Sequence, residues 1–332
     1  MIKVKISNGK KYLNDLLMRQ LQKSKDSEYE FFLNEDIQSC DIWIVMHVSG
    51  LMKTESVLCN PENTYYFSME PSENLGNVNH KFLSQFGGLF ITDRTVIHPN
   101  IIYKNIHTWW VGLKVSIVNF QHIFRSEASL DYEKLTTIKV EKTREISVIN
   151  SNKVNIPGHL KRQEFINKLK NHPISKYIDF YGYGGINFED KWQAISPYKY
   201  HIVIENSVID DYWSEKLADS YLGWAFPIYY GCMNIDKYFP QESFLRIDIN
   251  NFENSVSSIM QLVELNDYKN RIRDVKFSRD KVINDFNVFN IIKALPLKDK
   301  NNVQRVTLKP NYLFGRGPKK YLKYIKLLMS KK

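Results

Sequence analysis

The segment KYHIVIENSVIDDYWSEK (199–216) places hydrogen-bonding side chains directly after a short apolar run. The side chains there that could contact a polar ligand are Glu205, Asn206, Ser207, Glu215 and Lys216. Carboxylates suit the vicinal hydroxyls of a ribose, and amides and hydroxyls suit other polar ligand atoms. Ser214 can cap a helix that begins at the next residue, where a lysine would add its charge to backbone amides that favour an anion.

A second group of polar residues lies upstream, in SNKVNIPGHLKRQEF (151–165). Ser151 and Asn152 are expected at a strand end, and Arg162 on the helix that follows. An arginine that converges with Lys216 on one crevice could neutralise a diphosphate without a metal ion. On chemistry alone, a surface arginine and a solvated Glu-Lys helix face are the commoner interpretations of these residues. These residues therefore indicate an anionic ligand and no more.

Motifs of several common enzyme classes are absent. YGYGGI (181–186) lacks the G-x-G-x-x-G spacing, and there is no phosphate-binding P-loop, no H-E-x-x-H and no G-x-S-x-G. No two aspartates are separated by one residue, which argues against an enzyme that holds Mn²⁺ between such a pair and a diphosphate. The eight histidines show no ligand spacing. The sequence predicts no metal site and no cofactor.

The composition bounds the class of protein. The chain has 332 residues, 43% of them hydrophobic, which suits a soluble globular protein of two domains. The net charge of +10 favours an anionic partner, such as nucleic acid, a membrane surface or a phosphorylated small molecule. Three widely spaced cysteines suggest a reducing compartment. No signal-peptide core or membrane-spanning run is visible, so we expect a cytoplasmic location, with peripheral membrane contact as the alternative.

Strands and helices are predicted to alternate along the chain. Strands are predicted at 1–6, 40–47, 65–69, 88–91, 145–149, 178–181, 201–204 and 226–230, and helices at 14–22, 158–170 and 214–222. The charged segment 126–145 is interpreted as the connection between two βαβ series. The pattern predicts an α/β protein with two doubly wound parallel sheets, in domains 1–140 and 141–300. In such sheets ligands bind beyond the carboxyl ends of the strands, where the polar residues fall.

The stretch from 198 to 248 resembles the donor-binding region of the α-1,3/4-fucosyltransferases, glycosyltransferase family 10, of bacterial type. The motifs that carry the resemblance are, in chain order, Glu205-Asn206-Ser207, Tyr212-Trp213-Ser214-Glu215-Lys216, Pro227-Ile228-Tyr229-Tyr230-Gly231, Phe239-Pro240 and Ser243-Phe244. The similarity covers roughly residues 145–250. In the N-terminal half its best point is YYFSMEPSEN (65–74), which resembles a strand that ends in a glutamate beside the acceptor.

The resemblance implies a GT-B fold, in which two Rossmann-like domains face each other across a cleft. The implied reaction is inverting transfer of L-fucose from GDP-fucose to a hydroxyl of a glycan, with an α-1,3 linkage to a surface polysaccharide or lipopolysaccharide. Arg162 and Lys216 would then neutralise the diphosphate, and Glu215 would hold the ribose. The expected donor-binding residues are Asn152, Arg162, Tyr181, Gly182, Glu205, Asn206, Ser207, Tyr212, Glu215 and Lys216.

Inversion needs one base that deprotonates the attacking hydroxyl. Glu70 is the predicted base, because it follows a buried strand and precedes Pro71, which favours a turn. Glu73, Asp93 and His98 are the fallback candidates. The acceptor, the linkage and the oligomeric state are not encoded in any motif that we can interpret.

Three alternatives stay open. Trp213 stands where the family commonly has a smaller residue, so another GDP-linked sugar could be the donor. A degenerate enzyme that only binds its ligand, or a nucleic-acid-binding protein, would also fit the charge, although most aromatic residues fall inside apolar strands.

The basic tail at 301–332 has Tyr321, Tyr324 and Ile325 on one helical face, and it could lie on a membrane or pack on the fold.

Overall fold

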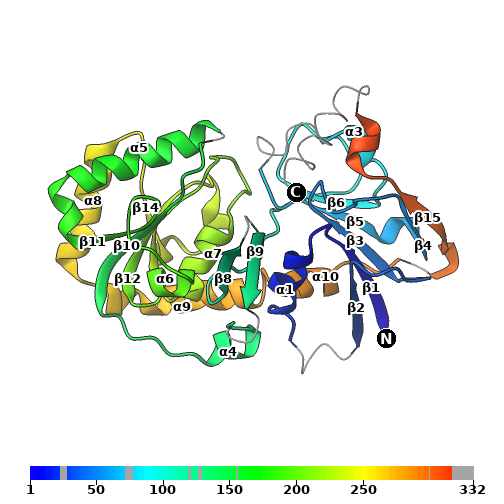
Figure 1. Ribbon diagram of the computed structural model, residues 1–332, viewed down its shortest axis with the longest axis horizontal. Coiled ribbons are helices and arrows are strands. Elements are labelled where there is room, and N and C mark those ends of the chain that lie inside the picture. The colour runs from blue at the N-terminus through cyan, green and yellow to red at the C-terminus, as the bar shows by residue number, and fades with distance from the viewer. Residues whose placement is uncertain are drawn as a thin grey trace. The chain divides into compact units, whose positions relative to one another are not determined.

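The computed structural model describes residues 1–22, 28–71, 78–118, 121–125, 129–154, 156–298 and 300–315. These residues separate into two compact units, each with its own sheet. Among them, residues 1–14, 28–105 and 296–315 belong to the first unit, and residues 15–22 and 106–295 belong to the second. Figure 1 colours both units from the N-terminus to the C-terminus.

The first unit is built on a parallel sheet with the strand order β2-β1-β3-β5-β6-β7. Its strands are β1 (Ile2–Ser7), β2 (Tyr29–Leu33), β3 (Ile42–Met46), β5 (Thr64–Phe67), β6 (Gly88–Ile91) and β7 (Ile101–Tyr103). Helix α3 (His80–Leu83) accompanies them, and α1 (Lys11–Met18) begins in this unit and ends in residues that belong to the second. The sequence of β3, IWIVM, is buried throughout, as expected for a central parallel strand covered on both faces.

A second, antiparallel pair of strands completes the first unit. β4 (Glu55–Cys59) pairs with β15 (Gln304–Leu308), and their Val57 and Val306 join the same core as Trp43. Residues 304–308, predicted to belong to a helical tail, are therefore a strand of the first unit. Residues 316–332, with the remainder of the predicted amphipathic helix, lie outside the described residues.

The second unit has a parallel sheet with the strand order β11-β10-β12-β13-β14. Its strands are β10 (Arg144–Asn150), β11 (Ile178–Gly182), β12 (Tyr198–Ile204), β13 (Phe226–Tyr230) and β14 (Leu245–Arg246), and β8 (Lys114–Val118) and β9 (Gln121–Arg125) form a separate hairpin. Its helices are α4 (Tyr132–Thr137), α5 (Pro157–Asn171), α6 (Lys191–Ile195), α7 (Glu215–Leu222), α8 (Phe252–Leu265), α9 (Tyr268–Ile283) and α10 (Val288–Lys293).

Helices cover both faces of the second sheet. α6, α7 and α9 contact β10, β12 and β13, while Phe165 of α5 packs edge-on against Phe252 of α8 with ring centroids 5.7 Å apart. Figure 1 shows α5 and α8 on the opposite side of the sheet from α9. Within α5 the buried face carries His159, Arg162 and Phe165. Leu160 of the same helix is 55% exposed and is not part of this buried face.

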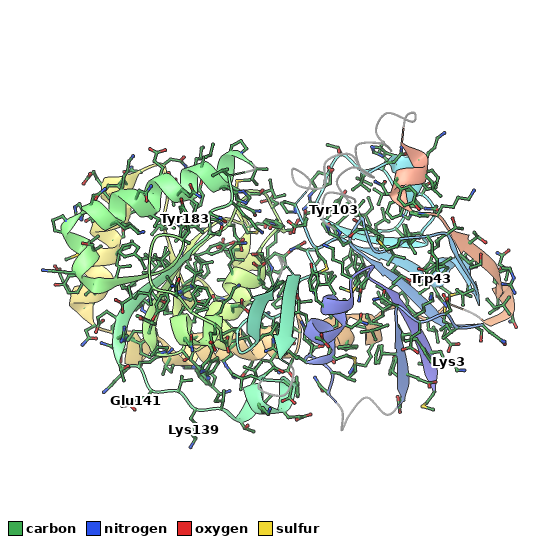
Figure 2. The ribbon with its side chains drawn as sticks, in the orientation of Figure 1. Lys3, Trp43, Tyr103, Lys139, Glu141 and Tyr183 are labelled. Carbon is green, nitrogen blue, oxygen red and sulfur yellow. The ribbon has the colours of Figure 1, made fainter. Side chains whose placement is uncertain are left out.

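The division between the units differs from the predicted boundaries at 140 and 300. The segment 126–145, interpreted as a connection, contains α4, whose Tyr132 and Leu135 are buried in the core of the second unit. Lys139 and Glu141, beyond α4, lie exposed on the outside of that unit (Figure 2). Two doubly wound parallel sheets nevertheless account for the fold, which confirms the predicted pair of Rossmann-like units.

Candidate functional site

The strand order of the second unit creates a natural crevice at its carboxyl edge. β10 leads through α5 to β11 on one side of the sheet, whereas β12 leads through α7 to β13 on the other side. The connections from adjacent strands β10 and β12 therefore run in opposite directions. Ligands of doubly wound sheets bind at such a point, beyond the carboxyl ends of the strands. The N-termini of α5 and α7 both begin beyond this edge, and helix N-termini favour anions.

Glu205 is the buried anchor of this edge. It follows β12, is 1% exposed, and its carboxylate accepts hydrogen bonds from the backbone amide and the hydroxyl of Ser214, at 2.8 and 2.7 Å. The Nζ of Lys216 lies 3.1 Å from the same carboxylate. A buried carboxylate with three donors is well compensated. Glu205 thus fixes the first turn of α7 and holds Lys216 from beneath the surface.

Glu215 and Lys216 remain charged at the mouth of the crevice, where their side chains are 29% and 26% exposed. Burial disfavours the ammonium group, but the carboxylates of Glu205 and Glu215 outweigh it and raise the pKa of Lys216. Burial likewise opposes the charge of Glu215, but Lys216 and Lys191 outweigh it and lower the pKa of Glu215 to about 2. The site therefore presents a fixed cation and a fixed anion at neutral pH.

Arg162 brings a second cation to the same edge. It lies on α5, is 6% exposed, and donates from Nη2 to the hydroxyl of Ser151, 2.7 Å away. Burial lowers its pKa and the nearby Glu205 and Glu215 oppose that shift, so the guanidinium stays charged. Arg162 is also near enough to lower the pKa of Lys216. Two cations therefore converge on the carboxyl edge between β10 and β12.

Buried polar atoms without a partner cluster around Arg162. Within the described residues, the Nε of Arg162, the Oδ1 of Asn150 and the Nδ1 of His159 are buried and make no hydrogen bond. Native proteins leave few such groups, because each costs free energy. All three lie at the end of β10 or in the first turns of α5. A polar ligand bound at this edge would supply the missing partners.

Gly158 lets α5 approach the strand end closely. A Cβ atom at Gly158 would lie 1.9 Å from the carbonyl oxygen of Asn206, so only glycine fits. The helix has no side-chain cap at Ile156, which leaves its first amides to other partners. The contact thereby brings the N-terminus of α5 against the segment that follows β12.

We expect Gly158→Ala to lower the free energy of unfolding by about 2 kcal/mol, because the added methyl group must push α5 away from Asn206. Urea denaturation measures this change. Leu160→Ala, in the same helical turn but 55% exposed, is the matched control and should stay within about 0.5 kcal/mol of the wild type. Equal stability of the two variants would contradict the close contact.

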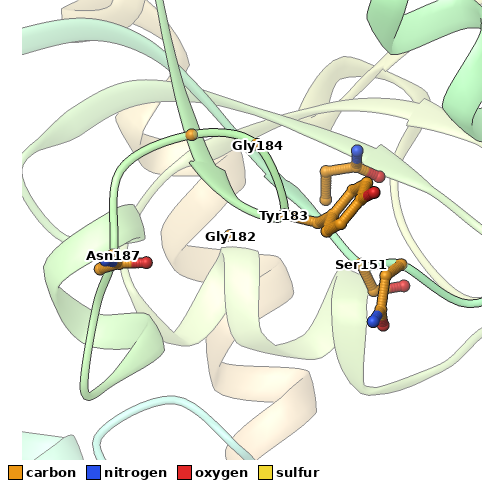
Figure 3. A pocket seen from close by; sticks show the side chains of 8 residues that line it. Ser151, Gly182, Tyr183, Gly184 and Asn187 are labelled. Atoms are coloured by element: carbon orange, nitrogen blue, oxygen red, sulfur yellow. The ribbon is translucent and has the colours of Figure 1, made fainter.

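An open pocket of about 550 Å³ adjoins these residues. Its lining comes from the ends of β10 and β11, namely Asn150, Ser151, Asn152, Gly182, Tyr183, Gly184, Gly185 and Asn187. Figure 3 shows Tyr183 and Ser151 near one another at this pocket, on the loop after β11 and the segment after β10. Gly182 adopts φ 84°, a left-handed conformation that turns the chain here. Tyr183 is 62% exposed and offers an aromatic face.

Several predicted site residues lie below the surface. The hydroxyl of Tyr181 lies 2.8 Å from that of Tyr198 in a buried cluster, so Tyr183, and not Tyr181, lines the pocket. Tyr212 is 2% exposed and donates to the Oδ1 of Asn206 over 3.0 Å, while Ser207 is also buried. These three residues shape the segment after β12 from within.

Trp213, whose size suggested a changed sugar pocket, belongs to the core. It is 1% exposed, and the centroid of its ring lies 5.0 Å from the ring centroid of Phe239 and 4.9 Å from that of Phe286. A tryptophan in this position anchors the loop before α7 to the hydrophobic core. It therefore gives no argument against any particular sugar.

Three residues of the site were missed by the sequence analysis. Asn150 was not singled out, although the first polar residue at the end of an apolar strand is a usable signal. No local pattern in the sequence marks His159 or Lys191, because their role depends on where the fold places them, next to Arg162 and Glu215. Burial and the charges of Arg162, Lys153 and Lys216 lower the pKa of His159, which favours its neutral form.

The candidates for the base lie in the first unit. Glu70 is half-buried, three residues beyond β5. Asp93 accepts hydrogen bonds from the amide and hydroxyl of Thr95, and the two ring nitrogens of His98 bond to the backbone of Asn100 and Phe86. Both fallbacks thus already make hydrogen bonds within the first unit. Glu73 lies outside the described residues.

Two absences hold for the described part of the chain. There, no group of three or more His, Cys, Asp or Glu side chains could hold a metal ion. None of the helices found in the same residues is both long enough and apolar enough to cross a membrane.

Comparisons with known proteins find similarity mainly in the second unit. Residues 139–276 match the family model described as "Glycosyltransferase family 10 (fucosyltransferase) C-term". The chain is 30% identical over 93 residues to the alpha-(1,3)-fucosyltransferase FucT of Helicobacter pylori, and the match covers 28% of this chain and 19% of that one. It is 28% identical over 100 residues to the human 4-galactosyl-N-acetylglucosaminide 3-alpha-L-fucosyltransferase 9, covering 28% of each. The matches thus span less than a third of these curated relatives.

The fold is similar over nearly the whole chain. A crystal structure of an alpha1,3-fucosyltransferase aligns with a TM-score of 0.50 and 16% identity, over 89% of this chain and 91% of that one. The two Rossmann-like units are accordingly those of a GT-B fold. The motifs at 205–216 that suggested the family fall inside the matched region. The similarity to the C-terminal model of glycosyltransferase family 10 thus covers residues 139–276 of this chain.

Proposed function

We propose that this protein is a glycosyltransferase that moves L-fucose from GDP-fucose to a hydroxyl group of a glycan, with inversion at the anomeric carbon. The observation that carries the proposal is the convergence of Arg162 and Lys216 on the carboxyl edge of the second sheet, beside buried polar atoms that lack partners. A sugar nucleotide offers the negative charge and the hydrogen-bonding groups that such an edge requires.

The diphosphate of the donor would contact Arg162, Lys216 and the first turn of α5. A guanidinium and an ammonium group supply the charge that a departing nucleoside diphosphate needs, so the reaction would proceed without a metal ion. The Nε of Arg162 would gain the partner that it lacks among the described residues. GDP would then leave as the bond to the sugar breaks and the acceptor oxygen forms the new bond.

The nucleoside would occupy the neighbouring pocket. Glu215 stays ionised through its contact with Lys216, 3.6 Å away, and its carboxylate would accept from the ribose hydroxyls. Asn152 and Tyr183 line the adjoining pocket, where an amide and an aromatic ring suit a nucleobase. The carboxyl edge would therefore hold the donor by its phosphates, its ribose and its base.

Glu70 would be the base that removes the proton from the attacking hydroxyl. Its carboxylate would take this proton as the acceptor oxygen attacks the anomeric carbon from the side opposite GDP. The names of the similar proteins support an α-1,3 linkage, and a surface polysaccharide or lipopolysaccharide is the acceptor that we propose. A location at the cytoplasmic face of a membrane would suit such an acceptor.

Calorimetric titration of the purified protein with GDP, UDP and CMP in the presence of a chelator tests this proposal. We expect GDP to bind and the other two nucleotides to bind at least tenfold more weakly, because a guanine-specific pocket rejects bases with different edges (about 1.4 kcal/mol for each factor of ten). Tighter binding of UDP would overturn the donor assignment. Binding of GDP without turnover of GDP-fucose in the presence of acceptor glycans would favour another GDP-sugar.

A further inference from the structure

A chain of alternating charges extends from the candidate donor site into the interior of the second unit. The Nζ of Lys191, the first residue of α6, lies 2.7 Å from Asp219 and 4.0 Å from Glu215. Lys216 in turn lies 3.6 Å from Glu215 and 3.1 Å from Glu205. Positive and negative groups thus alternate along five side chains from α6 and α7 to the end of β12.

Asp219 fixes the inner end of this chain. It is fully buried on α7, and one carboxylate oxygen accepts from the backbone amides of Trp110 and Val111, at 2.9 and 3.0 Å. Burial raises its pKa, and Lys191 together with the hydrogen bonds opposes that shift. Lys191 is therefore held by a buried carboxylate that two backbone amides keep in place. Its own side chain is only 22% exposed.

Lys191 lies between this anchor and Glu215. Glu215 already lies closer to Lys216, at 3.6 Å, than to Lys191, at 4.0 Å, and without Lys191 it would be drawn further toward the ammonium group that a diphosphate needs. With it, the charge of Glu215 is shared between two lysines that approach from different helices, α6 and α7. Each lysine also contacts a second carboxylate, Asp219 or Glu205, so the two lysines share three carboxylates between them.

We propose that Lys191 is a positioning residue for nucleotide binding, which holds the carboxylate of Glu215 in place and thereby leaves Lys216 available to the diphosphate. This inference rests on the proposed function for the identity of the ligand. It assigns to Lys191 and Asp219 a role that does not require contact with the nucleotide.

The charges that face Glu215 determine at which pH its carboxyl group is protonated. They are Lys216 and Asp219 on its own helix, Lys191 on α6 and Arg162 on α5. Lys216 and Lys191 together hold the pKa of Glu215 near 2, so wild-type Glu215 is ionised throughout the neutral and mildly acidic range. Loss of Lys191 removes one of these two cations. Protonation of Glu215 should then begin at a higher pH. Nucleotide binding should weaken as the pH falls, because the protonated carboxyl group is a poorer acceptor for the ribose hydroxyls.

The test compares Asp219→Asn with the double variant Asp219→Asn/Lys191→Met. The asparagine oxygen can still accept from Trp110 and Val111, and no buried charge is left without a partner in the double variant. We expect Asp219→Asn, in which Lys191 loses its anchor but keeps its contact with Glu215, to bind GDP more weakly than the wild type, and the double variant to bind about tenfold more weakly than Asp219→Asn at pH 7. Titration of GDP itself cancels in the ratio of the two affinities, which should grow as the pH falls toward 4.

Two further measurements separate positioning from simple structural support. Lys191→Arg should bind GDP about as tightly as the wild type does, since a guanidinium keeps the charge. Lys199→Met is the matched control, because Lys199 is 20% exposed and lies 2.6 Å from Glu145 at the opposite end of the same sheet. It should leave GDP affinity unchanged.

Titration of the Glu215 carboxyl by NMR in the nucleotide-free protein gives a readout that is independent of GDP. We expect a higher pKa in the double variant than in Asp219→Asn. Equal pKa values and equal GDP affinities of Asp219→Asn and the double variant would overturn the role of Lys191. GDP binding by the wild type would in that case still support the proposed function. If no variant, wild type included, bound GDP, both proposals would be overturned.

Discussion

Replacing Glu70 with glutamine should lower the rate of fucosyl transfer by about a thousandfold, because an amide cannot accept the proton of the attacking hydroxyl. Binding of GDP should be unchanged, since the residues proposed to bind it all belong to the second unit and Glu70 to the first. Single-turnover transfer from GDP-fucose measures the first effect, and calorimetry measures the second.

Glu62→Gln provides the control for this experiment, because Glu62 is an exposed glutamate of the same unit and should tolerate the change. Transfer by Glu70→Gln at more than a tenth of the wild-type rate would exclude Glu70 as the base. Glu73 would then be the next carboxylate to test, because Asp93 and His98 already make hydrogen bonds within the first unit.

Lys216→Ala should weaken GDP binding by about a hundredfold and lower the free energy of unfolding by about 3 kcal/mol. The loss of binding follows from removal of one of the two cations at the diphosphate. The loss of stability follows because Glu205, whose side chain is fully buried, keeps its two bonds from Ser214 but loses its cation. Calorimetry and urea denaturation measure the two effects.

The double variant Lys216→Met/Glu205→Gln separates these two consequences. Removal of the buried charge together with its partner should recover most of the stability, but not the binding of GDP. Lys199→Ala, which disrupts another lysine–glutamate pair of the sheet, should leave GDP binding intact. Recovery of GDP binding in the double variant would show that Lys216 serves Glu205 alone.

The sequence predicted those parts of the fold whose cause is local. Buried parallel strands are short continuous apolar runs, and β6 and β13 were predicted with their observed bounds for that reason. Amphipathic spacing located α5 and α7 to within a residue. The position of Glu205, Glu215 and Lys216 at the carboxyl edge then followed from the alternation of strands and helices.

The remaining features depend on contacts between distant segments. The strand β15 carries no strong apolar run, and its pairing with β4 more than two hundred residues earlier is invisible in local spacing. Tyr181 and Tyr183 look alike in sequence, yet one is buried against Tyr198 and the other lines the pocket. Lys191 meets Asp219 only because α6 and α7 pack against the same sheet.

The late pairing of β4 with β15 also orders events during synthesis. A ribosome releases residues 106–295, the bulk of the second unit, before it releases Gln304 to Leu308. Domains generally fold as units during translation, so the second unit can complete its sheet while β4 still lacks its antiparallel partner. The unit that begins first along the chain is thus finished last. An interrupted translation product would present the edge of β4 to other chains, which is a known route to aggregation.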